Sequence, residues 1–558
     1  MNFLQFKKLL LMTTLGTTLF TVSCTKDFGD INTNPATVVN PDVKFLLSYS
    51  EDQLVAYQGN EWVWESFEQM MRFTQHFTSS PYELTTNANS RYNAYYSNIL
   101  PNLFEIRRQI DLKEDQQDYA KMKAVTYIIQ ALHGIKVTDM NGSIPYSEAG
   151  QGRYEGKYSP AFDSQETLFT TWLTELDGAI ATLSAAGTAT EKTYGNSDVL
   201  YKGNWTKWIK LANTLKLRIA ARYENQDAAK TAAIVTQVLS SSIGPITEVE
   251  DNLTYTNPNF EPIGGAINYR DVKYGTIAIV DFMKKVKDPR IGVYFNPNDL
   301  VGDFRDVLDA NNSTLPSFID INDPLIQFQG GPVDWTTNAP QQNYFNNAFV
   351  VTPQDKYKLI STINRRFYAP RWDGSTQGTY TEVLASAGET CLLLAEFIEK
   401  GYGSGDAEAW YKKGVEASIR TMNMIAITAG STTAFTGSGD AEIAAYIAGV
   451  DVAFNGENDL ERIYVQQHLN LIRQPTEAFV FSRRTGYPKK TSSYYGREVF
   501  NEPIPRRFWI NDPGEVNRAN WSAAYTEQGF TPNIQDALTL SQERVWYDKN
   551  APAFGEGQ

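Results

Sequence analysis

Residues 205–222 read WTKWIKLANTLKLRIAAR, and this stretch decides the fold class. Its apolar residues recur at steps of three and four, a spacing that places one set on a single side of an α-helix: Trp205, Trp208, Ala212, Leu215 and Ile219. Lysines and arginines occupy much of the remainder. A period of 3.6 residues is typical of an amphipathic helix whose apolar side faces a core. The stretch therefore predicts a long helix packed against other helices.

The same period recurs elsewhere in the chain. It predicts helices over 119–137, 163–180, 204–222, 382–400 and 406–424. Asp163 is the expected N-cap of the second helix, because Glu166 follows three residues later as a capping-box partner. Amphipathic helices in pairs joined by short turns are typical of helical-repeat scaffolds. No tetratricopeptide consensus is readable at a 34-residue period, so the pattern alone predicts only a mostly helical scaffold.

The N-terminus has the pattern of an export signal. Lys7 and Lys8 precede the apolar stretch 9–22, and Ser23 stands directly before Cys24. This pattern predicts a lipoprotein signal peptide over 1–23, with cleavage before Cys24 and acylation of that cysteine. The apolar stretch is shorter than the roughly 20 residues that a membrane-spanning helix needs. The alternative is an ordinary cleaved signal in which Cys24 is incidental.

The composition is that of a globular exported protein, 42% hydrophobic and 20% charged. Removal of residues 1–23 takes away Lys7 and Lys8 but no acidic residue, so the net charge moves from −14 to −16. Such an acidic surface repels phosphate backbones and argues against nucleic-acid binding. With Cys24 acylated, Cys391 has no disulfide partner, and its apolar surroundings in the sequence predict a buried, unreactive thiol.

Composition also predicts the domain organisation. Residues 24–41 are polar and predict a lipid anchor and tether. A single large domain follows over 42–558, with its helical scaffold at about 42–242 and 376–484. Segments rich in proline, glycine, asparagine and aromatic residues fill about 243–375 and 485–558. Long irregular segments on a helical scaffold are where binding surfaces usually lie.

A series of short motifs runs through the chain in a fixed order. They are DFGDINTNP at 27–35, TDMNGSIPY at 138–146, PAFDSQE at 160–166, the helix at 205–222, DPR at 288–290, AE at 395–396, RRTGYP at 483–488, IPRR at 504–507 and EVN at 515–517. Together they resemble the SusD/RagB family of outer-membrane lipoproteins of Bacteroidetes, in the SusD-like branch described as starch-binding-associated. The resemblance covers almost the whole chain.

The resemblance implies a mostly α fold of tetratricopeptide-like helix pairs with a loop-rich irregular region. It also implies a surface lipoprotein, anchored in the outer membrane and facing the exterior, that captures a nutrient and hands it to a SusC-like TonB-dependent transporter. We expect the ligand to be a glycan, with a peptide, as in RagB-like members, as the alternative. The motifs themselves we expect to be structural: cations on the helix at 205–222 would extend to solvent, and Arg483, Arg484 and Gly486 would hold a turn and a buried ion pair.

Physical chemistry nominates the ligand contacts, because a sugar stacks its C–H faces on aromatic rings beside hydrogen-bonding side chains. Two groups of aromatic residues meet this description. Tyr82 and Tyr92 belong to the first, near Trp62 and Trp64. The second lies in the irregular region around Phe345 and Tyr368, and its candidates are Trp335, Tyr344 and Trp372.

An enzyme is the less favoured alternative. A surface glycoside hydrolase would need a pair of carboxylates, but aspartates and glutamates are too plentiful for any pair to stand out. His76, His133 and His468 are the only histidines and stand far apart, which argues against a metal site. We therefore expect no catalytic residues, no metal and no cofactor.

The anchor gives a first testable prediction. Cys24→Ala should release the protein from the membrane fraction without lowering its melting temperature, because the tether is expected to contribute no core residues. Fractionation of cells followed by thermal unfolding of the soluble protein measures both effects. A variant that stays in the outer-membrane fraction to the same extent as the wild type would contradict lipidation.

Overall fold

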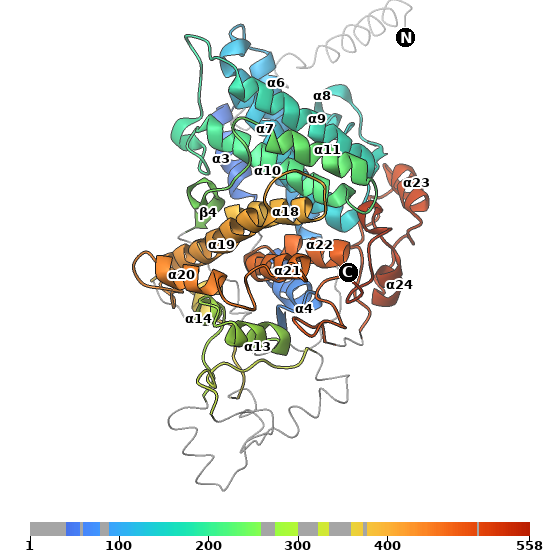
Figure 1. Cartoon of the computed structure of the whole chain (residues 1–558). Helices are drawn as coiled ribbons and strands as arrows, with labels where there is room; N and C mark the ends of the chain where they lie inside the picture. Colours follow the sequence, from blue (N-terminus) through green and yellow to red (C-terminus); the bar gives the residue numbers. More distant parts are fainter. Residues whose placement is uncertain are drawn as a thin grey trace, which may run out of the picture.

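The computed structural model describes residues 41–55, 60–78, 89–257, 274–299, 322–333, 359–371, 377–498 and 502–557, which form a mostly helical body (Figure 1). The earlier α-helices are α3 (Val43–Asp52), α4 (Met71–Phe73), α5 (Ser90–Ala94), α6 (Leu100–Asp111), α7 (Ala120–Asn141), α8 (Gly152–Glu155), α9 (Gln165–Ser184), α10 (Trp205–Tyr223) and α11 (Ala228–Leu239). The later ones are α13 (Ile277–Lys285), α14 (Ile291–Tyr294), α17 (Arg365–Tyr368), α18 (Ala387–Glu399), α19 (Ala407–Ala429), α20 (Asp440–Ile447), α21 (Asp459–Asn470), α22 (Pro475–Thr485), α23 (Arg518–Gln528) and α24 (Ala537–Gln542).

Strands and other helical turns complete the described chain. Three antiparallel strand pairs occur: β1 (Phe77–Thr78) with β5 (Tyr274–Gly275), β2 (Ile144–Pro145) with β3 (Phe162–Asp163), and β4 (Leu253–Asn257) with β6 (Tyr380–Ala385). Two segments are π-helical, η1 (Asn60–Met70) and η2 (Tyr95–Ile99). The 3₁₀ turns are η3 (Gln116–Tyr119), η4 (Gly195–Ser197), η5 (Val249–Asp251), η8 (Leu471–Arg473) and η9 (Trp546–Asp548).

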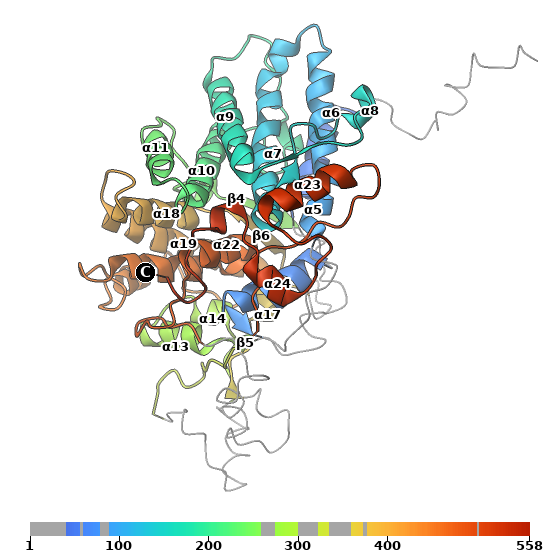
Figure 2. The ribbon, with the colours of Figure 1, turned by 90° about the vertical axis from the view of Figure 1, so that its right-hand side faces the viewer.

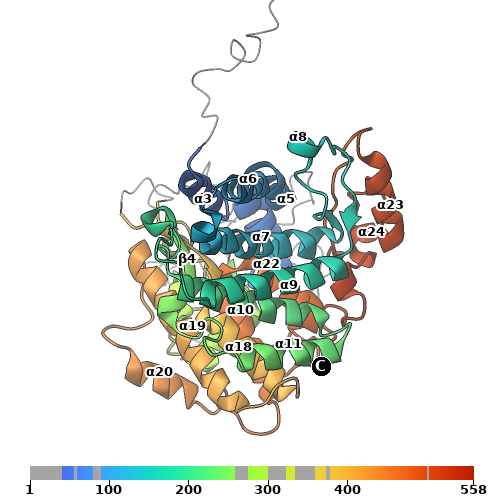
Figure 3. The same ribbon diagram turned by 90° about the horizontal axis from the view of Figure 1, so that it is seen from above.

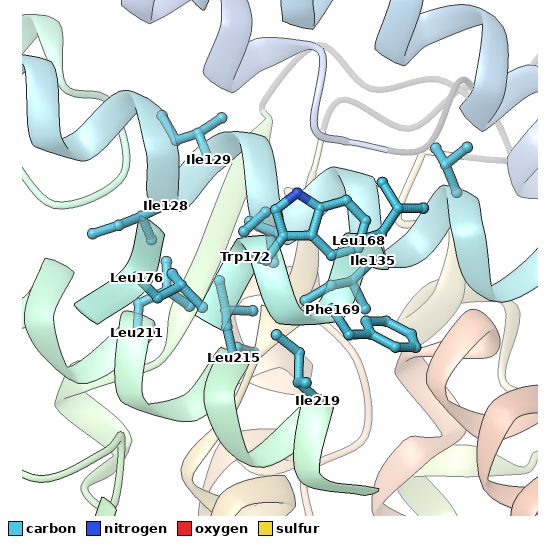
Figure 4. Packing of buried hydrophobic residues seen from close by; sticks show 14 of the residues in the cluster. Ile128, Ile129, Ile135, Leu168, Phe169, Trp172, Leu176, Leu211, Leu215 and Ile219 are labelled. Carbon is cyan, nitrogen blue, oxygen red and sulfur yellow. The ribbon is translucent and has the colours of Figure 1, made fainter. Parts of the chain in front are cut away.

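The long helices pack in chain order. Seen from above, α6, α7, α9 and α10 lie side by side, and α18 packs against α19 beyond them (Figure 3). Their facing sides form one large core in which Trp172 of α9 lies near Ile135 of α7 (Figure 4). Trp208 of α10 is fully buried, as the apolar periodicity predicts. This succession of packed helix pairs confirms the predicted mostly α scaffold.

Local capping explains where several helices begin. The Asn204 side chain accepts a hydrogen bond from the Lys207 amide at the start of α10, and Asp406 does the same for the Ala409 amide of α19. Both starts agree with the predicted segments. None of the helices in the described ranges combines the length and the apolar character that crossing a membrane requires.

Two predicted helix starts are wrong. Ser164, and not Asp163, caps α9, because the Asp163 carboxylate is already engaged by the amides of Tyr146 and Ser147 across the β2–β3 pair. The start at 382 is also wrong: residues 380–385 form β6, and Ser386 then caps α18. The strand forms because β4, far away in sequence, supplies the partner hydrogen bonds.

A network of buried ion pairs joins α7, α10, α18 and α22. Arg222 of α10 bridges Asp139 at 2.7 Å and Glu477 at 2.8 Å. Arg218 lies 2.6 Å from Glu389 of α18. The prediction that the cations of this helix extend to solvent is therefore wrong for Arg218 and Arg222, because inward-facing carboxylates neutralise them inside the core.

The arginine pair that precedes Gly486 completes this network. Arg484 of α22 donates to Glu396 at 2.5 Å and to Glu224 at 2.9 Å, and Arg483 donates to the carbonyl of Arg506 at 2.8 Å. Gly486 ends α22 with a φ of 69°, and a Cβ there would lie 2.7 Å from the carbonyl oxygen of Ala553. The prediction of a turn and a buried ion pair at this motif is confirmed.

The C-terminal segment also belongs to the body. Figure 2 shows α23 and α24 on the flank opposite α11 and α18. Aromatic residues of this segment are buried in the two main hydrophobic clusters: Tyr487, Tyr495, Trp509 and Trp521. Cys391 is buried in α18, and this burial raises the pKa of its thiol to about 12, in agreement with an unreactive cysteine.

The network predicts a large stability effect for Arg484. Burial alone would lower the pKa of Arg484, but the Glu396 carboxylate outweighs it and raises that pKa. Arg484→Met leaves Glu396 and Glu224 buried without this partner and should cost about 3–5 kcal/mol of unfolding free energy.

Arg420→Met is the matched control, because Arg420 forms exposed pairs with Glu416 and Asp440 and should cost at most about 1 kcal/mol. Urea unfolding measures both variants. Equal losses in the two would contradict the structural role of the buried network.

Candidate functional site

Of the predicted ligand contacts, Tyr92 is the one that lies within the described residues. Tyr82, Trp335, Tyr344 and Trp372 lie outside them, as does Cys24. Tyr92 is half-buried in α5, with its ring 4.5 Å from that of Tyr96. Burial raises the pKa of its hydroxyl, with a smaller contribution from Tyr525. Tyr92 therefore offers only part of its ring to a ligand.

The structure brings together the points from which the aromatic segments depart. Thr78 directly precedes the segment that holds Tyr82, and Val333 directly precedes the segment that holds Trp335 and Tyr344. The Thr78 hydroxyl donates to the Val333 carbonyl at 2.9 Å. Two candidate segments separated by more than 200 residues thus start side by side.

Further hydrogen bonds complete this arrangement, which we call the loop-root cluster: Gln75, Thr78, Thr276, Val333 and Glu498. The Gln75 side chain pairs with the backbone of Glu498 through two bonds of 3.0 Å. The Thr276 hydroxyl donates to the Gln75 carbonyl at 2.8 Å, and the Val333 amide donates to the Glu498 carboxylate at 3.2 Å. Four distant parts of the chain are tied together here.

Glu498 is the one titratable side chain of the loop-root cluster. Burial raises the pKa of its carboxyl to about 7, the Val333 amide opposes this shift, and Asp281 of α13 adds to it. The carboxyl therefore titrates in the neutral range, unlike an ordinary surface glutamate.

Aromatic residues form the floor below the loop-root cluster. Phe77 of β1 stacks on Phe67 with ring centroids 5.6 Å apart, and its ring lies 5.2 Å from that of Tyr368. Tyr368 and Trp62, which the sequence places among the loop aromatics, are both buried in this floor. Tyr368 is a core residue because Phe77 of β1 covers it. Trp62 is a core residue because Tyr380 covers it and accepts a hydrogen bond from its Nε1 at 3.1 Å.

A stacked histidine pair supports the floor from the side of α21. The rings of His76 and His468 lie 3.6 Å apart. His76 Nε2 donates to the His468 carbonyl at 2.6 Å, and His468 Nε2 donates to the Thr74 carbonyl at 2.8 Å. Each Nδ1 then accepts from a hydroxyl, that of Thr74 at 2.7 Å or of Tyr495 at 2.9 Å. Each ring nitrogen therefore has one hydrogen-bond partner, as two neutral imidazoles require.

Two hollows elsewhere in the described chain lack the features of a sugar site. An interior cavity of about 60 Å³ is lined by charged residues such as Glu61, Lys136 and Glu382, and it is far smaller than the roughly 300 Å³ of typical ligand pockets. An open groove of about 790 Å³ between α19 and α20 has only aliphatic and charged side chains among its described lining residues. Neither has a phenylalanine, tyrosine or tryptophan ring for stacking among its described lining residues.

The sequence reasoning missed four exposed aromatic residues: Phe45 and Tyr49 of α3, Tyr154 of α8, and Tyr158. Tyr154 donates to Glu105 and lies 4.6 Å from the Arg108 guanidinium, so its ring is partly covered. The four-residue spacing of Phe45 and Tyr49 places both on one face of a helix. The spacing does not distinguish an exposed pair from a buried one.

The described residues contain no group of three or more histidine, cysteine, aspartate or glutamate side chains placed to hold a metal ion. His133, which the sequence places on a packed helix, is buried with Nε2 3.0 Å from the Arg91 carbonyl. The described geometry is that of a helical body from which the candidate aromatic segments depart at adjoining positions.

Comparison with known families agrees with this description. Residues 32–510 match the model of the SusD-like family described as starch-binding and associating with the outer membrane, and the chain belongs to this family. No curated protein matches the chain.

Solved structures share the fold. A chitin-binding protein superposes with a TM-score of 0.67 at 21% identity, covering 91% of this chain and 100% of that one. A chitin-binding SusD homologue from Flavobacterium johnsoniae gives 0.65 at 21% identity over 92% and 100% of the two chains. A SusD homologue from Bacteroides fragilis gives 0.65 at 19% identity over 91% and 100%.

The histidine pair predicts acid destabilisation. Burial lowers the pKa of His76 to about 4, whereas the unfolded chain has an ordinary value near 6.5. The unfolded state therefore binds a proton that the folded state does not, and stability falls as the pH drops from about 6.5 to 4. His76 alone should contribute a loss of about 3 kcal/mol across this window.

His76→Gln tests this directly, because the glutamine amide can donate and accept at similar positions without titrating. Urea unfolding at pH 7 and pH 4.5 should show a smaller loss for the variant than for the wild type. Parallel pH profiles would show that His76 does not carry the effect.

Proposed function

We propose that this chain captures a glycan at the cell surface and delivers it to a SusC-like TonB-dependent transporter in the outer membrane. The family description supports both the glycan and the outer membrane. The chitin-binding proteins that share the fold add support for a polysaccharide ligand. The lipid anchor at Cys24, the signal peptide over 1–23 and the tether over 24–41 belong to the same proposal, because capture at the surface requires export and retention.

The loop-root cluster is the observation that carries the proposal. It ties Thr78 to Val333, so the segments that hold Tyr82, Trp335 and Tyr344 begin at adjoining positions. Trp372 follows Tyr368 by four residues, and Tyr368 lies against Phe77. A sugar chain binds most tightly where several rings and polar groups converge on a preorganised frame.

Substitution of the loop tryptophans tests the ligand site. Trp335→Ala and Trp372→Ala should each weaken glycan binding by about 1–2 kcal/mol. Each change removes a ring on which a sugar could stack, and burial of apolar surface contributes roughly 25 cal/mol per Å² before the costs of ordering. The melting temperature should change little. Titration calorimetry with chito- and malto-oligosaccharides, paired with thermal unfolding, measures both quantities.

Trp208→Ala is the matched control. Trp208 is fully buried in α10, so its loss should cost about 3–5 kcal/mol of stability and leave the affinity of the folded protein unchanged. Early melting with normal binding in both loop variants would assign Trp335 and Trp372 to the core. Binding of peptides in place of oligosaccharides would select the RagB-like alternative, and turnover of the oligosaccharide would select an enzyme.

The partner is tested separately. Mild detergent extraction and affinity purification of the chain should co-purify a much larger β-barrel protein. Absence of such a protein under conditions that preserve other outer-membrane complexes would contradict delivery to a transporter.

A further inference from the structure

Glu498 stands between the roots of the candidate segments. Its Oε2 accepts a hydrogen bond from the Val333 amide, and its backbone pairs with Gln75. Its Oε1 is buried and has no hydrogen-bond partner among the described residues. The carboxyl group is costly to ionise, because its burial and the neighbouring acidic Asp281 outweigh the stabilising backbone amides of Val333 and Ile277.

Among the described residues around Glu498, no charged group supplies a compensating cation. Asp281 of α13 faces it and is itself acidic. Lys284 of the same helix pairs with Asp323 at 2.5 Å. Arg497, the preceding residue, donates to the Phe73 carbonyl at 2.8 Å. Glu498 is thus held by amides and beside a like charge.

We propose that Glu498 is a positioning residue of the binding site, and that it holds the loop-root cluster together more firmly when protonated than when ionised. The proposal rests on the proposed function, because it assumes that the ligand binds to the segments that leave this cluster. It goes beyond that function in making the frame of the site sensitive to pH.

Proton linkage gives the direction in which the stability of the loop-root cluster changes with pH. Burial raises the pKa of Glu498 to about 7, whereas an opened cluster would expose the carboxyl with its ordinary value of 4.5. Between these values the closed cluster retains a proton that the opened cluster has lost. The stabilisation is therefore complete below pH 4.5 and disappears as the pH rises through 7. Since each pKa unit is a factor of ten, the equilibrium between closed and opened cluster can shift by up to about 300-fold.

Amide hydrogen exchange on the full chain tests the positioning without a ligand. Peptides that span 322–333 should lose about 50-fold of their protection between pH 5 and pH 8, after correction for intrinsic exchange rates. Glu498→Gln should abolish this dependence, because the amide keeps an acceptor for Val333 and has no proton to lose. Glu515→Gln, the same change at an exposed position, should follow the wild type.

Asp281→Asn provides a second measurement should Glu498→Gln fold poorly. It removes the like charge but leaves Glu498 in place, so the midpoint of the protection loss should move to lower pH. A wild type whose protection does not depend on pH, or a Glu498→Gln variant that retains the wild-type dependence, overturns the proposal.

Titration with chitohexaose tests whether the protonation state of Glu498 changes the affinity for a ligand. Affinity of the wild type should be higher at pH 5 than at pH 8, and that of Glu498→Gln should be the same at both. Identical pH profiles in the two proteins would overturn the role of Glu498 in positioning the site. If chitohexaose does not bind at all, the proposed ligand is wrong, and the exchange experiment alone decides whether Glu498 holds the cluster.

Discussion

The buried ion network around Arg222 and Arg484 is the constraint on which the rest of the structure depends. Removing a charged group from water costs several kcal/mol, so each arginine is tolerated only where its carboxylate partners are already in position. Asp139, Glu396 and Glu477 supply those partners from three different helices. Apolar packing also restricts how these helices meet, and each buried ion pair adds the requirement that its donor and acceptor atoms lie within hydrogen-bonding distance. We infer that the network selects the arrangement of α7, α10, α18 and α22.

This arrangement extends to the candidate site through a short path. Arg484 holds the last turn of α22, and Gly486 then reverses the chain in a conformation that other residues rarely adopt. Tyr495 follows and donates to His468 at 2.9 Å, which places the next few residues beside the histidine pair. Glu498 comes three residues later and joins the loop-root cluster. A rigid body therefore determines where the flanking segments begin, which is how folds usually carry variable binding loops.

Local signals in the sequence predicted much of the scaffold. The helices that begin at 204 and 406 are predicted correctly, because a 3.6-residue period acts within a few residues of chain. The cap at Asp163 was assigned wrongly because Asp163 and Ser164 are equally good capping residues. Only the pairing of β2 with β3 engages the aspartate and leaves the serine free. The helix start at 382 was wrong for a related reason, since a strand needs a partner that local sequence does not contain.

The sequence by itself determined the helical class, the family resemblance, the predicted anchor at Cys24 and the types of residue that could stack on a sugar. These properties depend on composition, short motifs and local periodicity. The tertiary structure alone decided that Arg218 and Arg222 are buried and not solvated, that Tyr368 and Trp62 are core residues, and that Thr78, Val333 and Glu498 meet. Burial and pKa depend on which distant segments surround a side chain, and those contacts form only when the chain folds. For the same reason Glu498, an ordinary glutamate in the sequence, acquires its raised pKa only in the folded protein.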